Sequence, residues 1–308
     1  MRVIYENGET DLATVYVGLC DDGSRIEFVE SVQPPIPQRE KWVLIISTLK
    51  GCPVKCPMCD AGGDYRGILS TKELFDQLDH LILGQYPTGS VPVKKLKVQF
   101  ARMGDPAFND NVLEVLSTFS SRYDAPGFLP SISTVAPSGR NPWFESLLHI
   151  KSSLPPGRFQ LQFSLHTTDY EARKTLIPIK TMSFREMAQY GETFYESQDQ
   201  KVTLNFANPE GFPMEPSALL PLFDPRVFLI KLTPVNPTVQ STHNHIRGRI
   251  DAESRSANDP LVNSFRDAGY DVILSIGEQR ENIIGSNCGM YVEKLAGSQI
   301  TDRLPVRG

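Results

Sequence analysis

The first 40 residues alternate apolar and polar positions along most of their length. Two runs, residues 13–17 and 25–29, follow this alternation and are separated by Asp21-Asp22-Gly23. A period of two residues is typical of a strand with one buried face, and the Asp-Gly pair is a turn signal. The pattern predicts a β-hairpin, and Pro34-Pro35-Ile36-Pro37 predicts a short linker after it. We therefore expect an N-terminal β-hairpin extension over residues 1–40.

From residue 42 onward, short apolar runs alternate with amphipathic stretches. Residues 43–46 form a continuous apolar run, typical of a strand that is buried on both faces. Residues 71–84 have helical spacing, with Thr71 as the expected N-cap and Gly84 as the expected end. Further strands are predicted at 96–100, 130–135, 159–165, 202–206, 227–232 and 271–276. Further helices are predicted at 111–120, 142–150, 170–176, 184–196, 216–223 and 260–268.

This alternation of strands and helices indicates an α/β fold with a parallel sheet. The predicted strand–helix units are close in number to those of a barrel, so we expect a partial or full parallel (β/α) barrel over residues 41–308. Residues 237–257 lack the rhythm and are predicted to form a long polar loop. Loops of that length in compact domains are usually functional or disordered.

Charge and hydropathy exclude several classes of protein. The chain has 308 residues and a formal net charge of −5, which argues against a surface that binds nucleic acid everywhere but leaves room for a local basic patch. No apolar run reaches the roughly 18 residues that span a bilayer, and the N-terminus lacks the form of a signal peptide. We expect a cytoplasmic protein that does not bind membranes.

Three of the five cysteines lie close together, directly after the first buried strand. Cys52, Cys56 and Cys59 have the spacing C-x₃-C-x₂-C, which provides thiolates for three corners of a 4Fe-4S cluster. No fourth cysteine is nearby, so one iron would have no protein ligand and could bind another molecule, as a catalytic cluster requires. The alternative is a structural zinc site with a distant ligand such as Cys288 or His166. Zinc is disfavoured because zinc sites usually contain a second pair of ligands at C-x₂-C spacing.

The cysteine motif resembles that of the radical S-adenosylmethionine superfamily, and the order of further motifs resembles its RlmN/Cfr-type branch of RNA adenine methyltransferases. The likeness covers roughly residues 40–295. Its landmarks are Met103-Gly104-Asp105-Pro106, Ser133-Thr134, Ser164-Leu165-His166, Ile177-Pro178-Ile179, Pro234-Val235-Asn236-Pro237 and Asn287-Cys288-Gly289. Together these short motifs are more specific than any one of them.

The resemblance implies that S-adenosylmethionine binds to the open iron. An external one-electron donor of the flavodoxin or ferredoxin type would then drive its cleavage to a 5′-deoxyadenosyl radical. Asp105, after Gly104, would accept from the amino group of the cofactor, although it is one methylene shorter than the Glu of the family. The other implied cofactor contacts are Met58 at the adenine edge, and Ser133, Ser164 and Asn236 at the carboxylate or ribose. Without the cysteine motif, these residues would be interpreted as caps of turns and helices. His166 would be interpreted as a rim histidine whose hydrogen bonds are made within the protein.

Two further cysteines take part in methyl transfer in the resembled family. One accepts a methyl group, and Cys288 matches its position. The other resolves a covalent protein–substrate adduct and would lie seven residues before Cys52, where this chain has Ile45. An aliphatic side chain neither takes a proton nor attacks sulfur, so the mechanism of the family cannot run unchanged. Cys20 is a weak substitute, since an isolated cysteine is more often a packing residue.

Two features weaken the case for RNA as a substrate. Only about 40 residues precede the expected barrel, so the N-terminal RNA-binding domain of the family is not expected, and residues 275–282 carry acidic side chains where the family is richer in arginine. With a net charge of −5, RNA is a disfavoured partner, because binding it depends on neutralising phosphates. A cluster on the polar loop either holds a phosphate or carboxylate or is solvated: His243, His245, Arg247 and Arg249.

Three functional hypotheses follow. The first is a radical enzyme that abstracts hydrogen from a small molecule or peptide, with Cys288 as catalytic thiol. The second is an RlmN/Cfr-like methyltransferase that acts on an sp² carbon of a nucleotide or RNA, with Cys288 as methyl carrier. The third is a non-catalytic iron–sulfur or zinc protein that keeps the fold.

Overall fold

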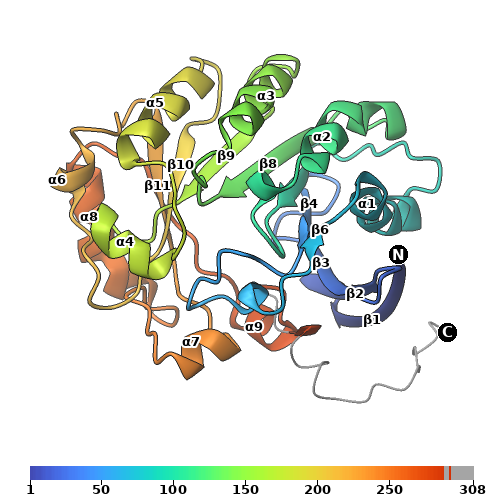
Figure 1. Ribbon diagram of the computed structural model, residues 1–308, viewed down its shortest axis with the longest axis horizontal. Helices are drawn as coiled ribbons and strands as arrows, with labels where there is room; N and C mark the ends of the chain where they lie inside the picture. The colour runs from blue at the N-terminus through green and yellow to red at the C-terminus, as the bar shows by residue number, and fades with distance from the viewer. Residues whose placement is uncertain (288–290, 293–308) are drawn as a thin grey trace. The chain divides into compact units, whose positions relative to one another are not determined.

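The computed structural model describes residues 1–287 and 291–292, which form two compact units (Figure 1). The first unit contains residues 1–53, 60–130 and the described residues from 279 onward. The second contains residues 54–59 and 131–278. The predicted division of the chain at residue 40 stays a prediction.

The strands of the first unit continue the predicted hairpin into a larger sheet. In order they are β1 (Arg2–Glu9), β2 (Ala13–Leu19), β3 (Arg25–Ser31), β4 (Trp42–Ile46) and β7 (Leu96–Phe100). The pairings from β1 to β4 are antiparallel, whereas β4 and β7 are parallel. The hairpin is therefore confirmed as β2–β3. The sequence did not predict β1, whose side chains are mostly half-buried on both faces and show no clear alternation.

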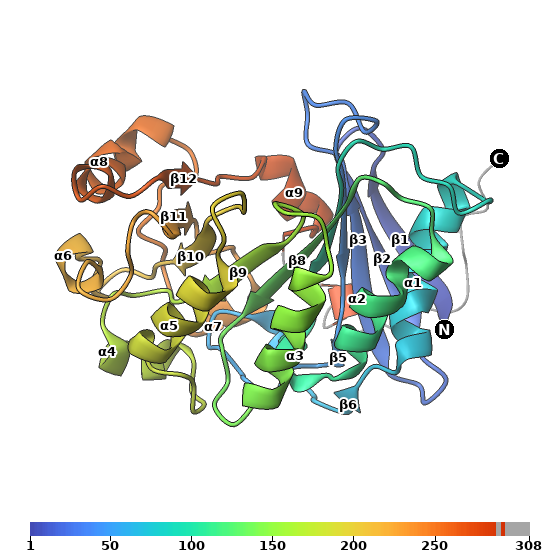
Figure 2. The same cartoon turned by 90° about the horizontal axis from the view of Figure 1, so that it is seen from above.

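Helices α1 (Thr71–Gln85) and α2 (Asn111–Arg122) pack side by side, and α1 lies against β4 (Figure 2). The predicted N-cap of α1 was wrong by one residue. Ser70 is the cap: its hydroxyl accepts from the Glu73 amide, and the Glu73 carboxylate accepts from the Ser70 amide in return. The predicted end was also too early, since Gly84 lies inside α1.

Short elements and one further helix complete the first unit. They are β5 (Leu49–Lys50), η1 (Asp60–Gly62), β6 (Gly67–Ile68), η2 (Pro106–Phe108) and α9 (Gln279–Ile284). Strands β5 and β6 pair with each other, and α9 packs on β1 and β2. This packing brings the chain just before Cys288 onto the N-terminal strands.

The second unit is built on parallel strands. Strand β8 (Phe128–Thr134) begins in the first unit, and β9 (Gln160–Ser164), β10 (Val202–Ala207), β11 (Phe228–Thr233) and β12 (Val272–Leu274) follow it in this order. The pairings from β8 to β12 are parallel. The helices between them are α3 (Asn141–Ser152), α4 (Tyr170–Leu176), α5 (Phe184–Phe194), α6 (Pro216–Leu219) and α8 (Asp259–Asp267). The predicted α/β class with a mostly parallel sheet is confirmed, although α6 and β12 are shorter than predicted.

The polar segment 237–257 is not a plain loop. It contains α7 (Val239–His243) and leads into η3 (Arg255–Asn258). Thr238 caps α7 by accepting from the Ser241 amide at 2.9 Å, and Asn258 accepts from the Asp251 amide at 2.9 Å. The prediction of a loop was wrong here because five residues are too few to show helical periodicity, and polar caps hold the turn. None of the described helices combines the length and apolarity needed to cross a membrane.

Candidate functional site

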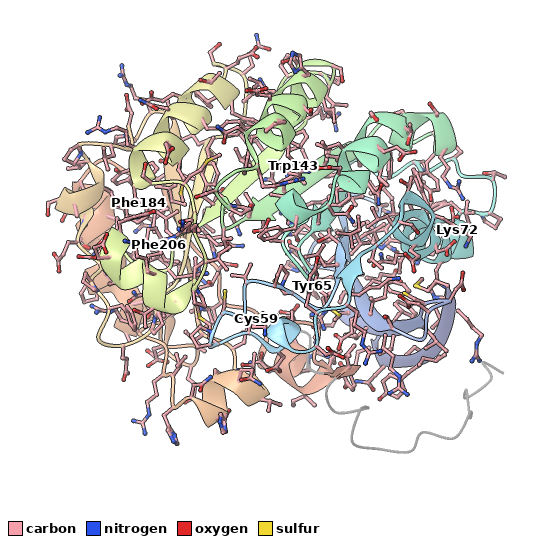
Figure 3. The ribbon with its side chains drawn as sticks, in the orientation of Figure 1. Cys59, Tyr65, Lys72, Trp143, Phe184 and Phe206 are labelled. Atoms are coloured by element: carbon pink, nitrogen blue, oxygen red, sulfur yellow. The ribbon has the colours of Figure 1, made fainter. Side chains whose placement is uncertain are left out.

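The three clustered cysteines lie in the loop between β5 and η1, where Figure 3 labels Cys59. Cys52 is buried, and Cys56 and Cys59 are partly exposed. The chain turns tightly between the last two, where the Cys59 amide donates to the Cys56 carbonyl at 3.0 Å, and Lys55, just before Cys56, has a φ of 57°. Partly exposed thiols on a tight turn suit a ligand loop.

Two side chains of the second unit hold this loop. The Thr238 hydroxyl donates to the Met58 carbonyl at 2.9 Å, and the Asn244 amide donates to the Pro57 carbonyl at 2.8 Å. Thr238 is completely buried. Sequence reasoning missed both donors; the only signal was their place in the polar segment that follows the Asn236 motif.

Gly104 and Asp105 lie just after β7, as predicted for residues at the end of a strand. Gly104 has a φ of +88°, and a Cβ at this position would lie 2.3 Å from Leu49 Cγ, so only glycine fits. Asp105 is buried, and its carboxylate accepts from the Ala107 amide at 2.9 Å, which caps η2. Its predicted contact with a cofactor amino group stays a prediction.

Ser133 and Ser164 lie at the carboxyl ends of neighbouring parallel strands. Ser133 pairs in register with Gln162, and Ser164, the last residue of β9, pairs with Asn205 of β10. Asn236 lies in the turn before α7, where its carbonyl accepts from the Ser241 hydroxyl at 2.9 Å. The structure thus places these residues on strand ends and their following turns, and their roles in binding stay predictions.

Two asparagines that sequence reasoning missed lie at the same strand ends. Asn205 and Asn208 are buried, and the Oδ1 atom of each has no hydrogen-bond partner among the described residues. The Asn208 amide group donates to the His166 carbonyl at 2.9 Å. A buried amide oxygen without a partner is costly, so these two acceptors at the ends of β9 and β10 are unusual in a folded protein.

The His166 side chain is neutral and has a hydrogen-bond partner. Its Nδ1 accepts from the Ala207 amide at 3.1 Å. Burial, helped by the nearby Arg173 guanidinium, lowers the pKa of His166 to about 3. A neutral imidazole with this bond fits the interpretation as a rim residue rather than a base.

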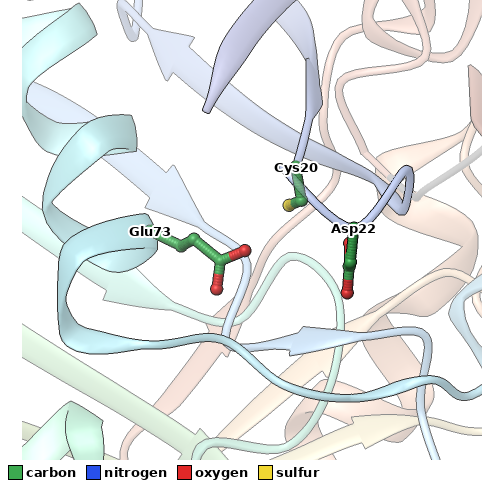
Figure 4. Close-up of side chains that lie close together, drawn as sticks. All are labelled: Cys20, Asp22 and Glu73. Atoms are coloured by element: carbon green, nitrogen blue, oxygen red, sulfur yellow. The ribbon is translucent and has the colours of Figure 1, made fainter.

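Cys20 lies in a charged cluster with Asp22 and Glu73 (Figure 4). The Cys20 Sγ and one carboxylate oxygen from each acid lie within 4.8 Å of one another. Lys50 Nζ lies 2.8 Å from both carboxylates, so its ammonium group already balances them. Burial, and then the Glu73 carboxylate, raise the pKa of the Cys20 thiol to about 12. A thiol that stays protonated is a poor nucleophile, which agrees with the interpretation of Cys20 as a packing residue.

Cys288 lies outside the described residues. The position of the missing second thiol, Ile45, is partly buried on β4 and packs against the apolar cluster that contains Val29 and Ile284. Tyr291 packs against the same cluster. Ile45 therefore lies among residues that flank Cys288 on both sides in the sequence.

The first unit contains a cavity of about 610 Å³ close to the predicted site residues. Gly51, directly before Cys52, and Met103, directly before Gly104, line it. Its other walls come from the turn 23–25, the loop 60–66, Lys50 and Val292. A concave site of this size fits a cofactor or small ligand.

In the basic loop cluster, Arg249 donates to the Phe212 carbonyl at 2.8 Å, and the Arg247 carbonyl accepts from the Glu210 amide at 2.9 Å. Arg249 is thus held by backbone of the second unit. The anion site predicted there stays a prediction.

No protein-family profile matches the chain. It is 26% identical over 285 residues to a protein of Chlorobium phaeobacteroides named probable dual-specificity RNA methyltransferase RlmN, covering 89% of this chain and 72% of that protein. It is also 26% identical over 306 residues to the dual-specificity RNA methyltransferase RlmN of Wolinella succinogenes, covering 94% and 83%.

Solved structures share the fold. A radical SAM methyltransferase from Sphaerobacter thermophilus superposes with a TM-score of 0.68 at 17% identity, covering 89% of this chain and 76% of that one. Streptococcus suis SuiB bound to S-adenosylmethionine superposes with a TM-score of 0.50 at 15% identity, covering 75% and 49%. The chain is therefore similar along most of its length to proteins named RNA methyltransferase RlmN, as its motifs predict, and it shares its fold with a solved radical SAM methyltransferase.

Proposed function

We propose that the protein is an RlmN-like radical S-adenosylmethionine methyltransferase that acts on an sp² carbon of a nucleotide or RNA base. The observation that carries this proposal is the likeness along 89% and 94% of the chain to proteins named RNA methyltransferases. Because of these relatives, the net charge of −5 no longer counts against RNA, and our expectation that RNA is disfavoured is not supported.

The residues present fit a 4Fe-4S cluster and S-adenosylmethionine. Cys52, Cys56 and Cys59 supply three thiolates, the donor set of a cluster with one open iron. The buried Oδ1 atoms of Asn205 and Asn208 accept no hydrogen bond from the described protein. A zwitterionic cofactor has the ammonium group and hydroxyl donors that such acceptors require.

The chemistry that a bound cluster supplies is the one-electron reduction of S-adenosylmethionine. The role that we assign to Cys288 is the acceptance of a methyl group. Its sulfur forms a bond to the methyl carbon while the bond from that carbon to the cofactor sulfur breaks. The thiol proton passes to solvent, and S-adenosylhomocysteine leaves.

The second candidate is hydrogen abstraction from a peptide or small molecule, with Cys288 as a hydrogen donor or proton relay. The observation that favours it is Ile45, an apolar packing residue at the position of the resolving thiol. Streptococcus suis SuiB, which shares the fold, has also been solved bound to its precursor peptide SuiA.

Product analysis separates the two candidates. The protein is reconstituted anaerobically with iron and sulfide, reduced, and incubated with methyl-labelled S-adenosylmethionine. Methyl transfer predicts S-adenosylhomocysteine and a labelled Cys288 peptide, and both disappear in Cys288→Ala. Formation of 5′-deoxyadenosine without either product supports hydrogen abstraction, and the lack of any iron–sulfur absorbance contradicts both candidates.

A further inference from the structure

Glu27 of β3 and Arg102, two residues after the end of β7, form a buried ion pair. Glu27 Oε2 lies 2.6 Å from an Arg102 terminal nitrogen, and the side chains are 0% and 3% exposed. A carboxylate and a guanidinium taken out of water this fully are stabilised by hydrogen bonds to their other atoms.

Both partners bind the backbone around position 288. Arg102 donates to the carbonyl oxygens of Gly285 and Ser286, each at 2.6 Å. The other Glu27 oxygen accepts from the amides of Tyr291 and Val292, each at 2.7 Å. One ion pair therefore holds the chain on the near side and on the far side of Cys288.

The same ion pair is tied to the loop that contains Gly104 and Asp105. The Glu27 amide donates to Met103 Sδ at 3.3 Å. The Ser47 hydroxyl donates to the Glu27 carbonyl and accepts from the Met103 amide at 3.1 Å. All these groups are buried. The anchor of the Cys288 segment is thus continuous with the predicted cofactor-binding loop.

We propose that Glu27 and Arg102 are positioning residues that fix the described backbone on both sides of Cys288, at residues 285–286 and 291–292, relative to the Met103–Asp105 loop. The role given to Cys288 rests on the proposed function, whereas the anchoring rests on the contacts above. Cys288 is two residues from Ser286 and three from Tyr291. Since one residue spans at most about 3.6 Å, only a short length of chain separates these anchored residues from position 288.

The test uses Arg102→Lys and Glu27→Gln in the reconstituted full-length protein. Lysine keeps the positive charge but cannot reach two carbonyls and a carboxylate together. We expect amide exchange over residues 285–292 and alkylation of Cys288 to be about threefold faster or more in Arg102→Lys. In Glu27→Gln an acceptor oxygen remains for Tyr291 and Val292, so exchange should rise more at residues 285–286 than at 291–292.

Arg122→Lys is the matched control, because Arg122 pairs with Asp79 in the same unit, away from this segment. It should leave exchange over residues 285–292 and alkylation of Cys288 as in the wild type. In Arg102→Lys we also expect less methyl label on Cys288 per 5′-deoxyadenosine formed, an uncoupling that simple destabilisation does not cause.

The anchoring is contradicted if Arg102→Lys and Glu27→Gln both fold, bind as much iron as the wild type and leave exchange over residues 285–292 unchanged. It is also contradicted if the control accelerates exchange as much as they do. Failure of the proposed function would give a different result. The wild-type protein would then carry no methyl label on Cys288, and this outcome does not depend on the exchange rates.

Discussion

The Thr238 hydroxyl donates a hydrogen bond of 2.9 Å to the Met58 carbonyl, between Cys56 and Cys59. The same oxygen accepts from the Ser241 amide at 2.9 Å and so caps α7. One buried side chain thereby ties the cysteine loop to the polar segment that follows β11.

Replacing Thr238 with valine keeps the side-chain volume but removes the donor and the cap. We expect a loss of about 1–2 kcal/mol in the free energy of unfolding. We also expect faster loss of iron to a chelator, because the loop between Cys56 and Cys59 is less firmly held. Thr242→Val is the control, since the Thr242 hydroxyl makes a local bond, to the Thr238 carbonyl at 2.8 Å, and does not contact the cysteine loop among the described residues. Equal rates of iron loss in the two variants would contradict the role of the Met58 contact.

The ligand assignment predicts different effects for different cysteines. Alanine at Cys52, Cys56 or Cys59 should abolish iron–sulfur absorbance after anaerobic reconstitution, because three thiolates are the minimum for a cluster with one open iron. Cys20→Ala should keep it, since Cys20 lies beside Lys50 in the charged cluster. Iron and sulfide content measure the effect. Full iron binding in any of the three ligand variants would show that the assignment is wrong.

The cluster of Lys50, Asp22 and Glu73 predicts a pH-dependent contribution to stability. A hydrogen bond from Lys50, and then one from the Ser24 amide, lower the pKa of Asp22 to about 2. Burial raises the pKa of Glu73, but bonds from Lys50 and Ser70 outweigh it and lower that pKa overall. Both carboxyls ionise more easily in the folded state than in the unfolded chain. Their contribution is therefore complete above about pH 5 and is lost as the pH falls towards 2.

We expect Lys50→Met to cost about 2 kcal/mol at pH 7, a value reduced for the half-exposed Asp22. The difference from the wild type should shrink between pH 5 and pH 2 in denaturant titrations. Lys72→Met, which removes an exposed pair with Asp76, should match the wild type throughout. A Lys50→Met difference that does not change with pH would contradict this explanation.

Local patterns were sufficient for most of the fold. The alternation in residues 13–17 and 25–29 sets the β2–β3 pairing, because each residue commits to one face of the sheet. Strand β1 has no such alternation, and α7 has five residues, fewer than two helical turns. Beyond their local partners, β1 packs against α9 and the cap of α7 bonds to the Met58 carbonyl, contacts distant in sequence that no local window contains.

The candidate site likewise has parts that the sequence could predict and parts that it could not. Three cysteines in eight residues form a local motif, so their chemistry could be predicted. Glu27 and Arg102 are 75 residues apart, and Thr238 and Met58 are 180 apart. Each of these contacts depends on tertiary packing, and Arg102 looks like any charged residue until the fold brings Glu27 to it.

The backbone at Gly104 predicts a strong effect of a single methyl group. In Gly104→Ala the new Cβ would lie 2.3 Å from Leu49 Cγ at a φ of +88°, so strain and overlap add. We expect about 3 kcal/mol or more of destabilisation. Gly23→Ala, with a φ of +81° and no atom within 4 Å of the added carbon, should cost only about 1 kcal/mol. Unfolding without cofactor measures both; equal losses would mean that overlap with Leu49 contributes nothing.

Ile45 is where the chain departs most from the resembled family, and a cysteine there tests whether one thiol limits the reaction. Ile45 packs against the cluster of Val29 and Ile284, together with Tyr291. In Ile45→Cys we expect a loss of about 1 kcal/mol from the smaller apolar side chain. Ile45→Val should cost a similar amount without adding a thiol.

If methyl transfer through Cys288 is the reaction, Ile45→Cys should increase the release of methylated nucleotide or RNA base from the protein–substrate adduct, as measured by mass spectrometry of the product. Ile45→Val should not. A gain that also appears in Ile45→Val would come from altered packing. No gain in Ile45→Cys, with an intact cluster and labelled Cys288, would mean that the adduct is resolved without a thiol at this position. Ile45 would then be a packing residue of a chemistry that does not require a second cysteine.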